Sequence, residues 1–235
     1  MTPRFALSAS DAMLEMCQTL VAEHADILVQ SHVNEDPDEI RKVADAFPWA
    51  PDYLGVYDRF GLTGPRTVLA HNVHATGAEL ARLAATGTSI AHCPTSNAAL
   101  GSGIFPLRRH IDAGVRVALG TDVGGGTGLG MMKEGLQAYL MQRVAADGVL
   151  LDPARLLYLS TLAGAEALGL AQEVGSLCAG KAADFVYLKP PGSSVLEAVL
   201  QHASAPEDML AALFTLGGAE SVREVRVEGT VVHQR

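Results

Sequence analysis

Three features are scarce in this 235-residue sequence, and each scarcity excludes a class of protein. Only three cysteines occur, without C-x-x-C spacing, which excludes a disulfide framework and suits a reducing compartment. Lysine and arginine total 17 against 26 aspartates and glutamates, and a net charge of −9 argues against a nucleic-acid partner. No apolar run approaches the roughly 20 residues of a membrane span, and the first residues lack the apolar region of a signal peptide. We therefore expect a cytoplasmic protein with no membrane partner.

The abundant residues are typical of a soluble α/β enzyme. The sequence is 49% hydrophobic and 18% charged, with 24 glycines and 11 prolines. Apolar strand-like runs alternate with helix-like segments, which predicts a largely parallel sheet. Strands are expected at 27–30, 67–70, 88–91 and 115–119, and helices at 11–24, 76–86, 105–113, 131–146, 153–168 and 195–216. A short strand near 185–188 and a strand or hairpin at 222–233 complete the pattern.

Polar, ionisable residues follow each of the four expected strands. The strands run into SHVNE, HNVH, HCPTSN and GTDVGGG. In a parallel α/β barrel the active site lies at the carboxyl ends of the strands, because several loops converge there. An open doubly wound sheet also places its ligand at that edge, so the pattern alone favours the barrel only slightly.

His32 and Glu35 form an H-x-x-E at the end of the first of these strands. A neutral imidazole is a good zinc ligand, and a nearby carboxylate can move protons. The alternative is a capping histidine beside a solvated acidic loop, since Asp36, Asp38 and Glu39 follow. The pair by itself does not decide between these interpretations.

His71 ends the next strand, and Asp122 precedes three glycines after the fourth. A carboxylate at a strand tip can bind zinc and accept a proton. The alternatives for Asp122 are a phosphate-binding loop, disfavoured because no lysine follows, and a plain turn. His71 and His74 lie on either side of a strand end and a turn, which disfavours joint metal binding. This favours a structural or surface role for His74.

The third strand ends in His92 and Cys93. Adjacent strand residues point to opposite faces, so a Cys–His nucleophile pair is disfavoured and Cys93 is interpreted as a buried apolar residue. The remaining histidines lie in helical or terminal segments and receive no role; they are His24, His110, His202 and His233. What remains is histidine, histidine and aspartate at the ends of different strands, with a glutamate beside the first histidine. That set predicts metal-assisted hydrolysis.

Several sequence blocks resemble one known family. In order, they are PRF, QSHVNE, VLAHNVH, IAHCPTSNAALGSG, LGTDVGGG and GKAAD. The S-H-x-x-E, A-H, H-C-P-x-S-N and T-D blocks are similar to those of amidohydrolase-superfamily enzymes, including chlorohydrolases and adenosine-type deaminases. PRF and TDVGGG resemble the guanine deaminases of that superfamily. The resemblance extends from Pro3 to about Val232.

This resemblance implies the hydrolytic deamination of guanine to xanthine and ammonia by a zinc-bound hydroxide, a step of purine breakdown. His32 and Asp122 are implied as ligands of Zn²⁺, with Glu35, His71 and Asp122 as catalytic residues. His71 would hydrogen-bond the metal-bound water, and Glu35 would move its protons to the purine ring and the leaving amine.

The substrate site implied by the same resemblance includes Arg4 and Phe5 from the PRF block. Arg4 would face the oxo group of guanine, where its fixed donors suit a carbonyl that gains negative character. His32, Glu35 and Asp122 would line the same site. Each would contact the substrate in addition to binding the metal or moving protons.

One departure from the family pattern shapes the expected fold. The family carries an H-x-H on its first barrel strand, and no H-x-H occurs in this sequence. The resemblance therefore implies a partial (β/α)₈ TIM barrel over 1–172, about strands four to eight, and a remnant of the small C-terminal β-sandwich with helices over 173–235. We expect weak zinc binding and little activity from the chain alone. We also expect a homo-oligomer or a requirement for the missing N-terminal strands.

Two alternatives stay open. One is another deaminase or chlorohydrolase of the same superfamily, which Arg4 and the glycines after Asp122 disfavour. The other is a non-catalytic fragment that acts through association with another chain.

Overall fold

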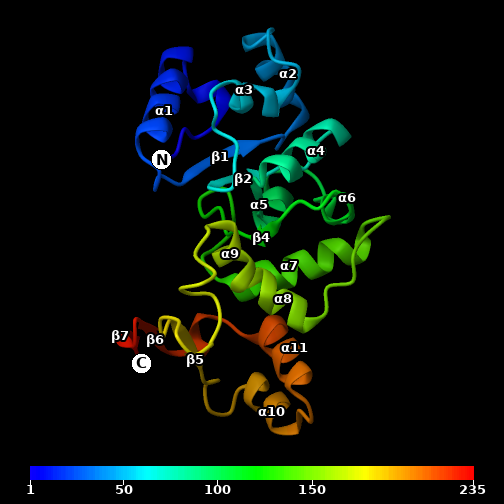
Figure 1. Cartoon of the computed structure of the whole chain (residues 1–235). Helices are drawn as coiled ribbons and strands as arrows, with labels where there is room; N and C mark the ends of the chain where they lie inside the picture. Colours follow the sequence, from blue (N-terminus) through cyan, green and yellow to red (C-terminus); the bar gives the residue numbers. More distant parts are fainter.

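The computed structural model describes residues 1–235 and contains two separate sheets (Figure 1). The first is four-stranded and parallel, in the order β1-β2-β3-β4. Its strands are β1 (Val29–Val33), β2 (Thr67–His71), β3 (Ser89–His92) and β4 (Val117–Leu119). All four predicted strands are therefore present, side by side and in chain order, with ends displaced by a few residues at most.

One helix precedes β1, others connect consecutive parallel strands, and further helices follow β4. They are α1 (Asp11–Glu23), α2 (Pro37–Ala46), α3 (Tyr53–Arg59), α4 (Gly77–Thr86), α5 (Pro94–Ala99), α6 (Leu107–Asp112), α7 (Met131–Val144), α8 (Pro153–Ser160), α9 (Leu162–Ala167), α10 (Val195–His202) and α11 (Pro206–Leu216), with 3₁₀ turns η1 (Ala6–Ser8) and η2 (Ala219–Ser221). The alternation of strand and helix confirms the predicted α/β class. None of these helices is both long and apolar enough to span a bilayer.

An extended segment at the start of the chain lies beside β1. The Met1 amino group donates to the Leu28 carbonyl at 2.8 Å. Backbone N–H groups of Gln30 and His32 donate to the carbonyls of Met1 and Arg4 at 3.0 and 3.1 Å. The segment is not a regular strand, but it runs along the free edge of β1 and brings Arg4 to the same end of the sheet as His32.

Local capping explains where α4 begins and ends. The Thr76 hydroxyl accepts from the Glu79 N–H, and the Glu79 carboxylate accepts from the Thr76 N–H, which forms a capping box. Gly87 ends the helix in the left-handed region at φ 71°, a conformation that costs glycine little. The helix predicted at 76–86 therefore begins and ends at signals that are present in the sequence, and the structure confirms it.

Two long helices predicted from the sequence are each divided in the structure. The segment 153–168 breaks at Thr161, which has φ −136° and ψ −89° and separates α8 from α9. The segment 195–216 breaks before Pro206, the first residue of α11, because proline disfavours a helical conformation in the residue before it.

A helix, α2, follows Glu35, so the alternative interpretation of a solvated acidic loop is wrong. Asp36 caps α2, and its carboxylate accepts from the N–H groups of Asp38 and Glu39 at 2.8 and 3.2 Å. Pro37 occupies the first helical position, where its missing N–H has no cost. Asp36-Pro37 was thus a helix-start signal in the sequence.

The parallel sheet buries one face against the helices and leaves the other partly exposed. Val33, Leu69 and Ile90 are fully buried in the hydrophobic core, together with Leu83 of α4. On the opposite face, Gln30, Val68 and Ala91 are only half-buried. His32 belongs to that second face by the alternation of β1, so its side chain is reachable from solvent.

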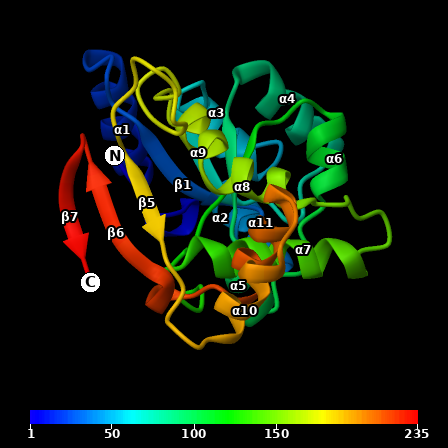
Figure 2. The ribbon, with the colours of Figure 1, turned by 90° about the horizontal axis from the view of Figure 1, so that it is seen from below.

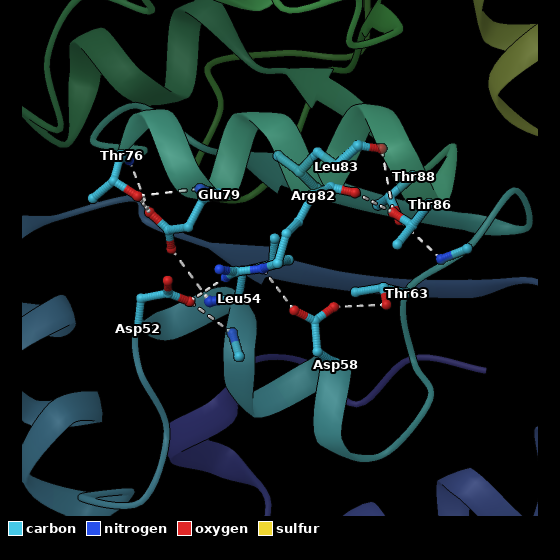
Figure 3. Close-up of polar contacts among 12 residues, drawn as sticks. Asp52, Leu54, Asp58, Thr63, Thr76, Glu79, Arg82, Leu83, Thr86 and Thr88 are labelled. Carbon is cyan, nitrogen blue, oxygen red and sulfur yellow. Dashed lines mark hydrogen bonds and ion pairs between the residues drawn. The ribbon is translucent and has the colours of Figure 1, made fainter.

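Ion pairs and hydrogen bonds attach α4 to α3 on the helical side of the sheet (Figure 3). Arg82 of α4 pairs with Asp52, which caps α3, and its Nε lies 2.9 Å from a carboxylate oxygen of Asp58. Asp58 in turn accepts from the Thr63 hydroxyl at 2.8 Å. These contacts hold the beginning of α4, including Glu79, in a defined place beside the strand ends.

The C-terminal region forms the second sheet. It is antiparallel, in the order β5-β6-β7, with β5 (Phe185–Leu188), β6 (Val222–Val227) and β7 (Thr230–Gln234). Glu228 and Gly229 have φ values of 50° and 77°, the pattern of a tight hairpin turn. The predicted hairpin is confirmed. Figure 2 shows the three strands along one side of the molecule, opposite α4 and α6.

Candidate metal-binding and catalytic site

His32 is held by the extended segment beside β1. Its Nδ1 lies 2.6 Å from the Arg4 carbonyl oxygen. A carbonyl only accepts hydrogen bonds, so Nδ1 carries the proton and Nε2 keeps its lone pair. Burial lowers the pKa of the His32 imidazole, which favours the neutral form that a metal ligand needs.

Asp122 follows β4 in a strained conformation. Its φ of 45° lies in the left-handed region, which costs a non-glycine residue on the order of 1–3 kcal/mol. The Ser96 hydroxyl donates to its Oδ2 at 2.7 Å. A Cβ on Gly125 would lie 2.7 Å from the same oxygen, so this glycine of the predicted loop is required by the close approach of the carboxylate.

His71 and Glu35 face each other across the ends of β1 and β2. His71 Nε2 lies 3.5 Å from Glu35 Oε2 and 3.8 Å from Asp122 Oδ2. The His71 side chain is completely buried, and its φ is 71°. Its Nδ1 is 2.9 Å from Asn97 Oδ1 and donates to that oxygen, and its Nε2 faces the two carboxylates.

Three of these side chains have the geometry to hold a metal ion. One ligand atom each from His32, His71 and Asp122 lies within 4.8 Å of the others. His32 Nε2 and Asp122 Oδ1 are 3.9 Å apart, less than the about 4.2 Å that two bonds of about 2.1 Å can span. His71 Nε2 is buried without a hydrogen-bond partner. Such an atom next to a His–Asp pair fits a site for a cation and its water.

Arg4 and Phe5 border the cluster without joining it. The Arg4 carbonyl contacts His32, but the Arg4 guanidinium lies over the Phe5 ring, 5.0 Å from its centroid. Arg4 is exposed and Phe5 is half-buried. The structure thus brings His32, Glu35, His71 and Asp122 together and leaves the Arg4 side chain free at the edge.

Comparison with known proteins places the chain in a family. A family model described as the amidohydrolase family matches residues 1–232. The chain belongs to the amidohydrolase family. Its fold is of the TIM-barrel type shared by its structural neighbours.

Several proteins that the chain resembles are described as guanine or adenosine deaminases. The chain is 56% identical over 235 residues to a probable guanine deaminase from Deinococcus radiodurans, covering 100% of this chain and 54% of that protein. It is similar to the structure of Escherichia coli guanine deaminase, with TM-score 0.96 and 38% identity over 99% of this chain and 54% of that one. An adenosine deaminase from Xanthomonas campestris with bound zinc gives TM-score 0.83 and 31% identity over 98% and 50%. The chain spans about half the length of the curated relatives it matches.

His92, at the end of β3, lies in an apolar environment apart from the four residues of the site. His92 is buried and stacked on Phe105 with centroids 4.3 Å apart, and burial lowers its pKa to about 3. Burial also raises the pKa of the Cys93 thiol, which removes the thiolate that a nucleophile requires. The interpretation of Cys93 as a buried apolar residue is consistent with this environment.

Three polar residues around the site were not singled out in the sequence. Ser96 and Asn97 in the first turn of α5 contact Asp122 and His71, as described above. Ser102 donates from its hydroxyl to Glu35 Oε1 at 3.2 Å, and its carbonyl lies 2.8 Å from His74 Nε2. All three belong to the block HCPTSNAALGSG. Many polar residues follow a buried strand directly in this block, and that concentration was the signal by which these three residues could have been found.

Replacement of Ser96 by alanine tests the support of Asp122. The change removes the 2.7 Å hydrogen bond that fixes the carboxylate. Loss of such an outer hydrogen bond typically lowers metal affinity about 10–100-fold, and we expect a loss in that range. Competition titration with a fluorescent zinc chelator measures it. Ser204→Ala, at an exposed helix start, is the matched control, and an equal zinc affinity in the two variants would contradict this role.

Proposed function

We propose that this chain takes part in the hydrolytic deamination of guanine to xanthine and ammonia. The observation that carries the proposal is the convergence of His32, Glu35, His71 and Asp122 at the strand ends. That arrangement suits hydrolysis assisted by a metal. The proposal is supported by 56% identity to a probable guanine deaminase along the whole chain.

The cation in this proposal is Zn²⁺, with His32 and Asp122 as its protein ligands. Imidazole nitrogen and carboxylate oxygen are both ordinary zinc ligands. The zinc-containing structural neighbour supports the same choice of metal. When bound, zinc supplies Lewis-acid chemistry that makes hydroxide available near neutral pH. The Arg4 carbonyl and Ser96 hydroxyl keep the two ligands aimed at one point.

Proton movement is assigned to Glu35 and His71. The Glu35 carboxylate accepts one proton from the attacking water and delivers it to the purine ring; it then carries the second proton of that oxygen to the leaving amine. The other oxygen of Glu35 is held by Ser102, so its Oε2 faces His71 Nε2. His71 uses the lone pair on Nε2 to accept a hydrogen bond from the water and orient it. Water adds at the carbon bearing the amino group, and ammonia leaves.

The substrate's oxo group is assigned to Arg4, with Phe5 beside it. Arg4 lies at the carboxyl end of the sheet, next to His32, and its guanidinium is not used in any ion pair. Fixed guanidinium donors suit an oxygen that gains negative charge during the reaction. Guanine therefore contacts Arg4 and Phe5 at one end and the group of His32, Glu35 and Asp122 at the other.

Two structural units follow from the same proposal. Residues 1–172 form part of a (β/α)₈ barrel, about its strands four to eight, and residues 173–235 correspond to a small β-sandwich with helices. Catalytic zinc sites use three protein ligands, and His32 and Asp122 provide two. At least one further donor comes from outside this chain, from a second copy or from another polypeptide segment that completes the barrel.

The test is a graft in which this chain replaces the matched segment of E. coli guanine deaminase; we refer to it as the graft. The TM-score of 0.96 over 99% of the chain makes the exchange feasible. We expect zinc-dependent release of ammonia from guanine and formation of xanthine, with little release from the chain alone. Adenine and a chlorinated triazine test the other superfamily reactions. A folded, zinc-loaded graft that leaves guanine unchanged would contradict the proposal.

Substitution of Arg4 by alanine tests the assignment of the oxo group. A hydrogen bond to a charged donor contributes about 1.5–3 kcal/mol, so kcat/KM for guanine in the graft should fall roughly 10–100-fold. The backbone carbonyl that orients His32 survives the change. 2-Aminopurine, which lacks the oxo group, should lose far less. Equal losses for both substrates would remove Arg4 from the site and favour another superfamily reaction.

A further inference from the structure

A buried hydrogen bond joins the two turns that carry Glu35 and His71. Asn34 Nδ2 donates to Asn72 Oδ1 at 3.0 Å. Asn34 directly precedes Glu35, and Asn72 directly follows His71. The two asparagines therefore connect the ends of β1 and β2 at the point where the proposed proton-moving residues leave the sheet.

The asparagine pair is anchored at both ends by buried groups. Asn34 Nδ2 also donates to Glu79 Oε1 at 2.9 Å, and Asn72 Nδ2 lies 2.9 Å from His110 Nε2. His110 Nδ1 lies 3.0 Å from the Pro106 carbonyl, which can only accept, so Nε2 is the acceptor for Asn72. Burial lowers the pKa of His110 to about 4, so its ring is neutral and this donor pattern is consistent.

Glu79 receives donors on both of its oxygens, which fixes the far end of the network. Its Oε1 accepts from the Leu54 N–H at 3.3 Å, and its Oε2 accepts from the Thr76 N–H and hydroxyl at 2.8 and 2.9 Å (Figure 3). Asn34, Asn72, Glu79 and His110 are each at most 2% exposed. Groups buried in this way cannot replace their hydrogen bonds by bonds to water, so the network is rigid.

The backbone of both asparagines adopts an uncommon conformation. Asn34 has φ 49° and Asn72 has φ 51°, both in the left-handed region that asparagine tolerates better than most residues. Backbone bonds also join the turns: the Asn72 N–H donates to the Val33 carbonyl at 2.9 Å, and the His74 N–H donates to the Asn34 carbonyl at 3.1 Å. Each turn reverses the chain within one residue of Glu35 or His71.

We propose that Asn34 and Asn72 are positioning residues that set the relative placement of the Glu35 carboxylate and the His71 ring. The inference rests on the proposed function. The side chains of the two asparagines bond to each other, to Glu79 and to His110, and not to His32 or Asp122. Their amide–amide bond ties the two turns to α4 through Glu79 and to α6 through His110. The 3.5 Å separation of Glu35 Oε2 and His71 Nε2 depends on that tie.

Asn72→Gly is the main test, because glycine keeps the left-handed backbone and removes only the amide. In the graft we expect kcat for guanine to fall about 10–100-fold, the usual cost of losing an orienting contact, with KM and zinc content unchanged. Leu83→Ala is the control: it removes a buried side chain of the same helix as Glu79. It should lower the melting temperature and leave kcat within about twofold.

The metal-free 235-residue chain supplies a second readout that needs no activity. The ¹⁵N–¹H signals of the His71 imidazole report its tautomer and mobility. We expect Asn72→Gly to shift and broaden them, while Leu83→Ala leaves them in place. Asn72→Asp serves if the glycine variant fails to fold: it keeps the acceptor for Asn34 but cannot donate to His110, and its effect should be intermediate.

The outcomes separate this inference from the proposed function. If the unmodified graft does not deaminate guanine, the proposed function fails, and the His71 signals still decide whether the asparagines position that ring. If the graft is active and Asn72→Gly retains its kcat with unchanged His71 signals, the positioning role is overturned and the proposed function stands.

Discussion

Replacement of Glu35 by glutamine is expected to lower guanine turnover in the graft by about 10²–10⁴-fold, the range attributed to general acid–base catalysis. Glutamine has nearly the same shape and still accepts the Ser102 hydrogen bond, but it cannot take up a proton near neutral pH. Because Glu35 is not a proposed ligand, zinc content should be unchanged. Steady-state xanthine formation and elemental analysis of the purified variant measure the two effects.

Asp38→Asn is the matched control for Glu35→Gln. Asp38 lies three residues further along the chain, is exposed, and pairs only with Arg41 on the surface of α2. Asp38→Asn removes one negative charge, as Glu35→Gln does, but from the exposed surface of α2. The variant should therefore keep normal turnover. Xanthine formation near the unmodified rate in Glu35→Gln would refute the proton-transfer role. Loss of zinc in that variant would instead make Glu35 a ligand.

Replacement of Asp122 by alanine in the graft is expected to reduce zinc retention strongly and to abolish turnover. Asp122 Oδ1 is the proposed partner of His32 Nε2 in holding the metal, 3.9 Å away. Without Asp122, this chain gives the metal only His32, and the donors from the rest of the graft lack the carboxylate that completes the site, so zinc is held less tightly. Ammonia release should fall to the rate of the blank, and zinc content should fall with it.

Asp147→Ala, an exposed change on the loop after α7, controls for the loss of a carboxylate elsewhere. The Asp122 and Glu35 variants then differ in a diagnostic way: the first loses metal and activity together, and the second loses activity alone. Full zinc content in Asp122→Ala would mean that the ion sits elsewhere, and the cluster of His32, His71 and Asp122 would have another purpose.

The strand-end residues of the site were predictable from the sequence because regular elements leave short-range patterns. His32, His71 and Asp122 each follow a short apolar run, and parallel strands in chain order place their carboxyl ends at one edge. Thr76 and Glu79 are three residues apart, so their capping box could also be predicted. The break at Thr161 could not, because a helical pattern continues on both sides of it.

The supporting contacts were outside the reach of such patterns. Ser96 is 26 residues from Asp122, and Ser102 is 67 residues from Glu35. Which side chains meet at these separations depends on strand order, on register and on the rotation of each helix. The left-handed turns at His71 and Asp122 add a further change of direction that strand alternation does not predict.

By itself, the sequence determined the α/β class, the order of the parallel strands' polar ends and the resemblance to amidohydrolases, because these depend on residues close together in the chain. Tertiary structure alone decided that the Arg4 carbonyl selects the His32 tautomer, and that Asn34 and Asn72 bond beneath the site. The physical reason is that a hydrogen bond requires donor and acceptor within about 3 Å. For residues distant in the chain, packing of the whole domain determines that proximity.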